Sequence, residues 1–194
     1  MKAVVFYATR EGHTRRVADH IASDLRAHNM DVDLYDVKTL HASIDWSLYD
    51  WACVAASVHV GHHEREMIAF VRRYREELTR LSAAFFSVTL SEAGAEDPRA
   101  PQERRDKAAA DARRMIDMFE LETGWRPARA LPVAGALSYS RYSFIIRFVM
   151  KQIACKAGAP TDTSRDYELT DWSALDRFVG EAAQAADFRL VGAH

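Results

Sequence analysis

The chain has 194 residues, of which 48% are hydrophobic and 28% are charged, and its formal net charge is −2. A chain of this length and composition can bury one hydrophobic core, so we expect a single domain over residues 1–194. The nearly balanced charge argues against nucleic acid as a partner, since nonspecific binding to nucleic acid requires a strongly basic surface.

The two cysteines, Cys53 and Cys155, form no CxxC pair and no cluster with histidines at zinc-ligand spacing. We therefore expect a reducing, cytoplasmic setting and no metal site. The start of the chain carries only Lys2 before a short apolar run that turns polar at Thr9, so we do not expect a signal peptide. No apolar run reaches the roughly 20 residues of a spanning helix, so any membrane contact is expected from one side only.

The first half of the chain alternates between predicted strands and helices. Residues 2–8 are almost continuously apolar, as in a parallel strand covered on both faces, and residues 13–28 repeat apolar side chains at helical spacing. Residues 31–37 alternate like a shorter strand at a sheet edge, and residues 50–57 form a second buried strand. Residues 64–81 predict one amphipathic helix.

The alternation continues through the second half. Residues 83–89 predict a third apolar strand, and residues 92–100 predict a loop because they contain glycine and proline. Residues 102–121 predict a charged helix, and residues 131–137 a fourth core strand.

After residue 137 the simple alternation stops. Residues 138–165 predict an insertion, which is followed by a short strand at 167–169 and a closing helix from Asp171 or Trp172 to about Asp187. Right-handed crossovers between parallel strands then predict an α/β fold with a doubly wound, five-stranded parallel sheet. Such sheets bind ligands at the carboxyl ends of their strands.

The turn after the first predicted strand has the composition of a phosphate site. It consists of Thr9, Arg10, Glu11, Gly12, His13 and Thr14. Its backbone N–H groups, the positive end of the following helix and the hydroxyls of Thr9 and Thr14 can converge on one anion. No lysine follows Gly12, and the three spaced glycines of a dinucleotide site are absent, so a mononucleotide phosphate fits best. The alternative is an ordinary turn with a threonine cap.

A second feature is a long stretch without acidic residues. The 39 residues from Thr123 to Thr161 contain no Asp or Glu, although the whole chain has 28 acids. The stretch contains six basic residues: Arg126, Arg129, Arg141, Arg147, Lys151 and Lys156. This pattern predicts a locally positive surface.

Within that stretch, residues 141–157 predict a helix with two apolar sides. Tyr142, Ile145, Ile146, Val149 and Ile153 form a face that can dock on the domain. On another side lie Phe144 and Phe148, flanked by Arg147 and Lys151. This arrangement favours contact with an anionic lipid surface or ligand, whereas the alternative is a helix buried on both sides whose basic side chains extend to water.

Several segments together resemble a known family. TREGHT after the first strand resembles the flavodoxin phosphate loop. In combination with AASVHVGHH (55–63), FFSVTL (85–90), WRPARALPVAGALSYSRY (125–142) and TDTSRDYELTDW (161–172), it resembles the bacterial flavodoxin-type protoporphyrinogen oxidases, the quinone-dependent protoporphyrinogen IX dehydrogenases. The resemblance covers nearly the whole chain. It implies a long-chain flavodoxin-like fold, an FMN cofactor and oxidation of protoporphyrinogen IX to protoporphyrin IX in haem biosynthesis. It also implies a membrane quinone as acceptor and peripheral contact with the inner face of the cell membrane.

The resemblance also implies site residues. It puts the FMN phosphate on Thr9–Thr14, where Glu11 departs from the hydroxyl residue common in flavodoxins. One wall of the isoalloxazine site is implied for Ser57, Val58, His59, Val60 and Gly61, and the other for Ser87, Val88, Thr89 and Leu90. Neither wall has a Trp or Tyr, which favours an open ring face that a flat tetrapyrrole or a quinone could approach.

The histidines and basic residues leave several functions open. His59 is the candidate proton acceptor, whereas His62 and His63 are expected at the start of the following helix. Arg141, Arg147 or Lys151 would suit the propionates of the substrate. The alternatives are a flavodoxin-type electron carrier, an FMN-binding quinone reductase, or a membrane-docked FMN module without activity. The acid-free stretch disfavours a carrier, since carriers usually meet basic partners through acidic rims. No oligomeric state follows from the sequence.

Overall fold

The centre of the fold is a parallel sheet of five strands. The computed structural model describes residues 1–137, 139–141, 148, 151–152, 154–155, 159 and 161–191. Its sheet has the order β2-β1-β3-β5-β6, and every neighbouring pair in this order is parallel. The strands are β1 (Lys2–Ala8), β2 (Asp31–Asp36), β3 (Trp51–His59), β5 (Ser82–Thr89) and β6 (Arg129–Ala134). The predicted doubly wound sheet is confirmed.

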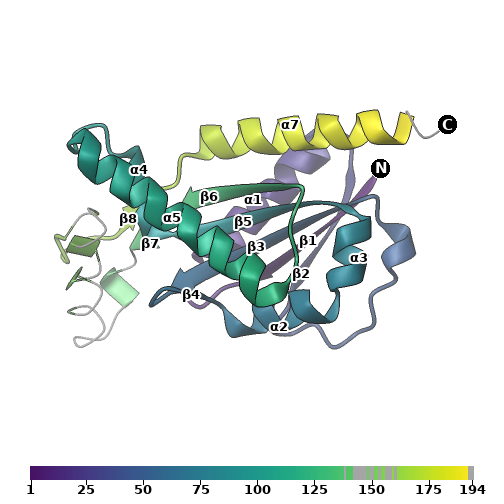
Figure 1. Ribbon diagram of the computed structural model, residues 1–194, viewed down its shortest axis with the longest axis horizontal. Coiled ribbons are helices and arrows are strands. Elements are labelled where there is room, and N and C mark those ends of the chain that lie inside the picture. The colour runs from purple at the N-terminus through teal and green to yellow at the C-terminus, as the bar shows by residue number, and fades with distance from the viewer. Residues whose placement is uncertain are drawn as a thin grey trace.

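Helices cover both faces of the sheet (Figure 1). One face carries α1 (His13–Ala27) and α7 (Trp172–Val191), and the other carries α2 (Arg65–Arg73), α3 (Arg75–Arg80) and α5 (Gln102–Thr123). A short 3-10 helix, η1 (Trp46–Leu48), precedes β3. The inner strands β1, β3 and β5 are covered on both faces, which explains their almost continuous apolar sequences.

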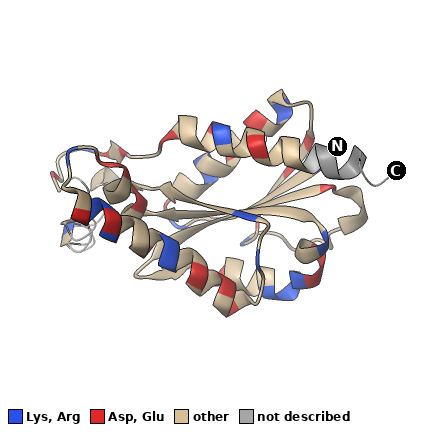
Figure 2. Ribbon diagram, turned by 45° about the horizontal axis from the view of Figure 1, so that its top comes forward, with Lys and Arg blue, Asp and Glu red and all other residues tan. Residues whose placement is uncertain are grey.

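Each face of the sheet has its own hydrophobic cluster. Val5 and Ile21 pack with Val179 under α1 and α7. On the other face the rings of Phe85 and Phe119 stack with centroids 4.2 Å apart, under α5. Charged residues lie mainly on the outer sides of the helices, and the central strands are almost free of them (Figure 2).

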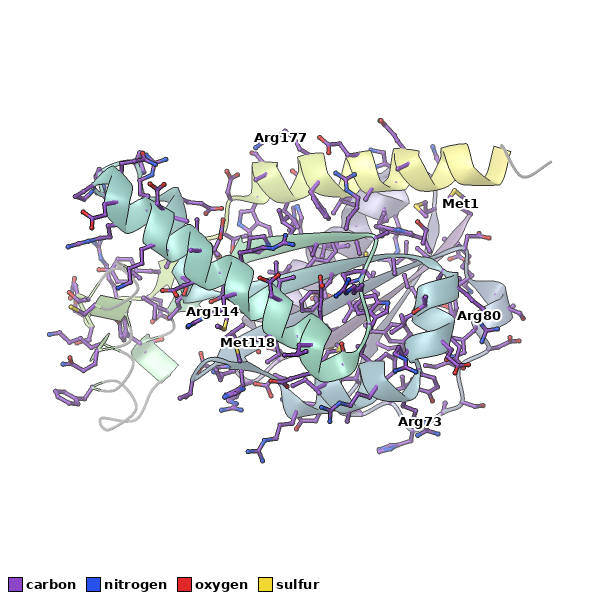
Figure 3. All side chains as sticks on the ribbon, viewed as in Figure 1. Met1, Arg73, Arg80, Arg114, Met118 and Arg177 are labelled. Atoms are coloured by element: carbon purple, nitrogen blue, oxygen red, sulfur yellow. The ribbon has the colours of Figure 1, made fainter. Side chains whose placement is uncertain are left out.

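Figure 3 shows side chains that project outward from the helices on both faces of the sheet. Arg73 on α2 and Arg177 on α7 are exposed and project away from opposite faces of the sheet. The surface of the protein is therefore polar where the helices face water, and its apolar side chains fill the two layers beside the sheet.

Three predicted elements differ from the structure. The helix predicted over 64–81 is interrupted at Tyr74, which has φ −111° and separates α2 from α3. The loop predicted over 92–100 begins instead as a helix, α4 (Leu90–Glu96). Thr89 caps this helix, since its Oγ1 accepts a hydrogen bond from the N–H of Ser91 at 3.3 Å.

The strand predicted over 131–137 is also divided. Gly135 separates β6 from β7 (Ala136–Leu137), and β7 pairs antiparallel with β8 (Tyr167–Glu168) in a separate two-stranded sheet. A short 3-10 helix, η2 (Tyr139–Arg141), follows β7. His62 and His63, expected at the start of the following helix, directly precede Glu64, the N-cap of α2, and form β4 (His62–His63), which pairs antiparallel with β3.

Only part of the predicted basic helix lies within the described residues. Residues 148, 151, 152, 154 and 155 are helical; Phe148 is 62% exposed, whereas Ala154 is buried against Leu137 and Tyr139. Lys151 is exposed as well. The side chain of Arg141 and the whole of residues 144 and 147 lie outside the described part, so the predictions for Arg141, Phe144 and Arg147 stay predictions.

Two of the six basic residues of the acid-free stretch lie beside carboxylates. Nη2 of Arg129 lies 2.7 Å from Oε2 of Glu181, and Nε of Arg126 lies 4.0 Å from Oε2 of Glu120. Both carboxylates come from outside the stretch. Among the described helices, none is both long and apolar enough to cross a membrane.

Candidate functional site

A pocket lies where the strands of the parallel sheet end. We call it the strand-end pocket. It is lined by Thr9, Glu11, His13 and Thr14 after β1, by Ser57, Val58 and His59 at the end of β3, by Val88, Thr89 and Leu90 at the end of β5, and by Gly135 and Ala136 after β6. The position is the one at which open parallel sheets bind their ligands.

The turn after β1 has the geometry expected of a phosphate loop. Gly12 precedes α1 with φ 90°, a conformation that side-chain-bearing residues rarely adopt. Its N–H donates to Oγ1 of Thr9 at 2.9 Å, which closes the turn. The first turn of α1 begins directly at His13, so the positive end of the helix faces the pocket lined by His13 and Thr14.

Two buried hydroxyls in the strand-end pocket are unsatisfied. Thr14 is 1% exposed and Ser57 is 9% exposed, and within the described part of the chain neither Oγ1 of Thr14 nor Oγ of Ser57 has a hydrogen-bond partner. Buried polar groups in folded proteins are nearly always hydrogen-bonded, because a missing partner costs about 1–3 kcal/mol. Two such hydroxyls beside a helix N-terminus are therefore suited to hold a bound anion.

A buried carboxylate, Glu64, lies behind the turn. Its side chain is 2% exposed, and its Oε2 accepts from Nζ of Lys38 at 3.0 Å. The same ammonium donates to the backbone carbonyl of Thr9 at 2.7 Å. Oε1 lies 3.3 Å from Nε of Arg10 and 3.3 Å from Nε2 of His59. Neither of these two contacts is aligned as a hydrogen bond, so they act through charge rather than directed bonding.

The wall formed by β3 continues into a tight hairpin with β4. His59 pairs with His62 across a two-residue loop in which Val60 has φ 51° and Gly61 has φ 80°. Positive φ at both loop residues matches the twist of the strands, but Val60 is β-branched and therefore strained there. The Val60 side chain is 85% exposed at the tip of the hairpin.

His59 is the histidine that reaches the strand-end pocket. Burial lowers the pKa of His59 below its usual value, and Arg10 adds to this effect, while Glu64 opposes it. The ring is therefore neutral near pH 7, which is the form that can accept a proton.

Ser87 and His63 do not line the strand-end pocket. The hydroxyl of Ser87 is fully buried and is 2.9 Å from Nε2 of His63, whose ring packs against Phe85 and Phe119. Burial lowers the pKa of His63 to about 3. Of the predicted wall at the end of β5, Val88, Thr89 and Leu90 line the pocket, whereas Ser87 is buried against His63.

Sequence comparison decides the family. A flavodoxin domain model matches residues 4–164. The chain belongs to the flavodoxin domain family.

Curated relatives match nearly the whole length of the chain. The chain is 32% identical to the protoporphyrinogen IX dehydrogenase [quinone] of Escherichia coli, over 96% of this chain and 97% of that protein. It is 30% identical to the enzyme of the same name from Leishmania major, over 94% of this chain and 74% of that protein. Among solved structures, oxidised flavodoxin 1 from Bacillus cereus has a TM-score of 0.51 at 20% identity, over 95% of this chain and 98% of that one. The similarity to the Bacillus cereus flavodoxin is a similarity of fold.

The flavodoxin domain brings most, but not all, of the predicted cofactor residues to the strand-end pocket. Arg10, Gly12, Val60, Gly61 and Ser87 do not line it. Gly12 lines an adjacent hollow together with Arg16 and Glu168, and that hollow shares Glu11, His13 and Ala136 with the strand-end pocket.

Four residues near the pocket were not predicted. Gly135 and Ala136 line it because β6 ends at Ala134, and the glycine within LPVAGAL was the signal for that end. Glu64 and Lys38 support the turn from behind. Their contact joins residues 26 positions apart in the sequence, so no local pattern could reveal it.

Proposed function

We propose that this chain binds FMN in the strand-end pocket and oxidises protoporphyrinogen IX to protoporphyrin IX, passing electrons to a quinone. The reaction is supported by relatives named protoporphyrinogen IX dehydrogenase [quinone], which align with 94% or more of this chain. The cofactor is supported by membership of the flavodoxin domain family. The observation that carries the assignment to this pocket is the pair of unsatisfied hydroxyls on Thr14 and Ser57.

The residues present fit the phosphate of FMN. Gly12 opens α1 with a positive φ, and the free N–H groups of the first helical turn can donate to an anion. The Thr14 hydroxyl lies on that first turn, and its orphaned oxygen gains a partner when an anion binds. Arg10 and Lys38 add positive charge behind the turn, although Glu64 offsets part of it.

The residues on either side of the pocket fit the flavin ring. Val58 and His59 form one wall, and Val88, Thr89 and Leu90 form the other. FMN, when bound, supplies a hydride acceptor at its N5 atom. No Trp or Tyr lines this pocket in the described part of the chain, so a flat substrate has access to the ring.

His59 is proposed as the proton acceptor for the substrate. Its neutral ring lies in the wall of the pocket, and Glu64 lies 3.3 Å from its Nε2. The negative charge of Glu64 favours the tautomer with a proton on Nε2, which leaves Nδ1 able to accept the proton released from the porphyrinogen.

Residues 138–165 are proposed to form a basic amphipathic insertion within one domain. Phe148 and Lys151 are exposed in its described part, which supports peripheral contact with an anionic membrane on the cytoplasmic side. Such contact would bring the flavin site to a quinone dissolved in the bilayer.

Anaerobic stopped-flow absorbance of the flavin-loaded protein tests the proposal. Protoporphyrinogen IX alone should bleach the oxidised flavin, and a quinone added afterwards should restore it. Since the two substrates react in separate steps, steady-state kinetics should be ping-pong.

Two other outcomes would contradict the reaction. If porphyrinogen leaves the flavin oxidised while a reduced protein donor bleaches it, the chain is an electron carrier. If only a reduced nicotinamide bleaches it and a quinone reoxidises it, the chain is a quinone reductase.

A further inference from the structure

His13, the first residue of α1, has one ring nitrogen in a fixed hydrogen bond. Its Nε2 lies 3.0 Å from Oγ1 of Thr170. The hydroxyl of Thr170 donates its only proton to the backbone carbonyl of Ala134, at 2.7 Å. The oxygen of Thr170 must therefore accept from His13, and Nε2 of His13 carries a proton.

The other ring nitrogen of His13 has no partner. Nδ1 is buried, and no group in the described part of the chain forms a hydrogen bond with it. In the neutral ring Nδ1 is a bare lone pair, because the proton is on Nε2. His13 lines the strand-end pocket next to Thr14, whose buried hydroxyl is also unsatisfied. Two adjacent residues of the same helical turn thus present unsatisfied polar atoms.

Burial and the neighbouring charges both act on the pKa of His13. Glu168 on β8 lies 3.7 Å from Nε2, and Arg16 on α1 lies 2.7 Å from the same carboxylate. Glu11 is in the same turn, and the centroid of the uncharged Trp172 ring on α7 lies 6.4 Å from that of the His13 ring. Burial lowers the pKa of His13 and the positive charge of Arg16 adds to this, while Glu168 and the backbone carbonyl of Ala134 only partly oppose it. Without ligand the ring is neutral near pH 7.

An incoming phosphate changes this balance. A dianion beside a lone pair on Nδ1 would be repelled, whereas a proton on Nδ1 creates a charge-assisted hydrogen bond. Glu168 then lies beside the resulting imidazolium and stabilises it further.

We propose that His13 is a specificity-determining residue whose Nδ1 takes up a proton from solvent when the phosphate of FMN binds, and then donates to that phosphate. The inference rests on the proposed FMN site. It makes binding of the phosphorylated flavin, but not of riboflavin, coupled to protonation of the protein. The proposal also gives a role to the contact between His13 and the hydroxyl of Thr170, a residue that follows the insertion in the sequence.

Isothermal titration calorimetry tests this coupling. FMN is titrated into the apoprotein near pH 7.5, in two buffers with different ionisation enthalpies, where the FMN phosphate with its second pKa of about 6 is already a dianion. The wild type should take up close to one proton for each FMN bound, and none with riboflavin. His13→Gln should bind FMN without proton uptake and at least about tenfold more weakly, whereas the exposed control His41→Gln should behave like the wild type.

A second measurement on the wild type does not depend on the folding of a variant. In imidazole ¹⁵N spectra, Nδ1 of His13 should change from the unprotonated to the protonated chemical shift on addition of FMN, and should not change with riboflavin. FMN binding without proton uptake, or with the same uptake in His13→Gln, would overturn the role of His13 and leave the FMN site standing. Failure of FMN to bind the wild type would overturn both.

Discussion

The buried carboxylate of Glu64 accepts a hydrogen bond from the ammonium of Lys38 at 3.0 Å. Since that ammonium also donates to the carbonyl of Thr9, the pair connects the start of α2 to the turn after β1. Glu64 does not line the pocket, but it thereby supports the turn through Lys38.

Glu64→Ala should remove this support. We expect a loss of about 2 kcal/mol in the free energy of unfolding, below the range for a fully buried ion pair because Lys38 is partly exposed. FMN affinity should fall as well, since the Thr9 carbonyl loses its anchor. Urea unfolding and FMN fluorescence titration measure the two effects. Glu66→Ala, an exposed glutamate on the same helix, is the matched control, and equal behaviour of the two variants would rule out the supporting role.

Thr14→Val should separate cofactor binding from stability. The substitution removes a buried hydroxyl that has no partner within the described residues and keeps the shape of the side chain. The apoprotein should therefore be equally stable or more stable in thermal unfolding. FMN affinity should fall about tenfold, or about 1.4 kcal/mol, while riboflavin affinity stays constant. A parallel loss for both flavins would place the phosphate elsewhere.

His63 should make the protein sensitive to acid. Its pKa is lowered to about 3 in the folded protein, whereas an unfolded histidine titrates near 6.5. Above pH 6.5 both states are neutral and the residue has no effect on pH dependence. Between pH 6.5 and about 3 only the unfolded state gains the proton, so stability falls as pH falls, by up to about 1.4 kcal/mol per pH unit.

Chemical denaturation at a series of pH values between these limits measures the slope. His63→Gln should be less stable at neutral pH but should lose stability less steeply in acid. His41→Gln serves as the control because His41 is an exposed histidine, whereas His62 itself lowers the pKa of His63. An unchanged slope in His63→Gln would show that the acid sensitivity originates elsewhere.

Phe148 and Lys151 should carry part of the membrane contact. The double variant Phe148→Ser, Lys151→Glu should reduce binding to vesicles with anionic lipid roughly tenfold or more, since each basic residue near such a surface contributes about 1 kcal/mol. Raised salt should weaken the wild type in the same direction. Co-sedimentation with vesicles measures the effect.

The matched control carries the same two changes on α5, at the exposed residues Leu121 and Lys107. Leu121→Ser, Lys107→Glu should leave vesicle binding unchanged. If both double variants lose binding equally, the contact depends on overall charge and not on the insertion.

The strands and the phosphate turn could be predicted because their signals are local. The continuous apolar runs of β1, β3 and β5 reflect coverage on both faces of the sheet, and the positive φ of Gly12 follows from its place between strand and helix. The pocket at the strand ends follows from parallel topology alone.

The remaining features depend on contacts between distant residues. Gly94 favours a loop in the sequence, but it is a buried residue of α4. Tyr74 shows no local signal for the break between α2 and α3. The hydrogen-bond partner of Ser87 is His63, which the pairing of β4 with β3 places, and the sequence did not reveal that pairing.

The parallel sheet also separates the pocket from the ends of the described chain. Met1 lies beside the start of β1, and α7 runs to Val191 at the same end of the molecule, whereas β4, β7 and β8 lie at the opposite end (Figures 1 and 3). A linker at either end would therefore hold the protein by the side remote from its pocket. If the protein were attached to an electrode or a bead through such a linker, every molecule would present the end with the pocket to the solution.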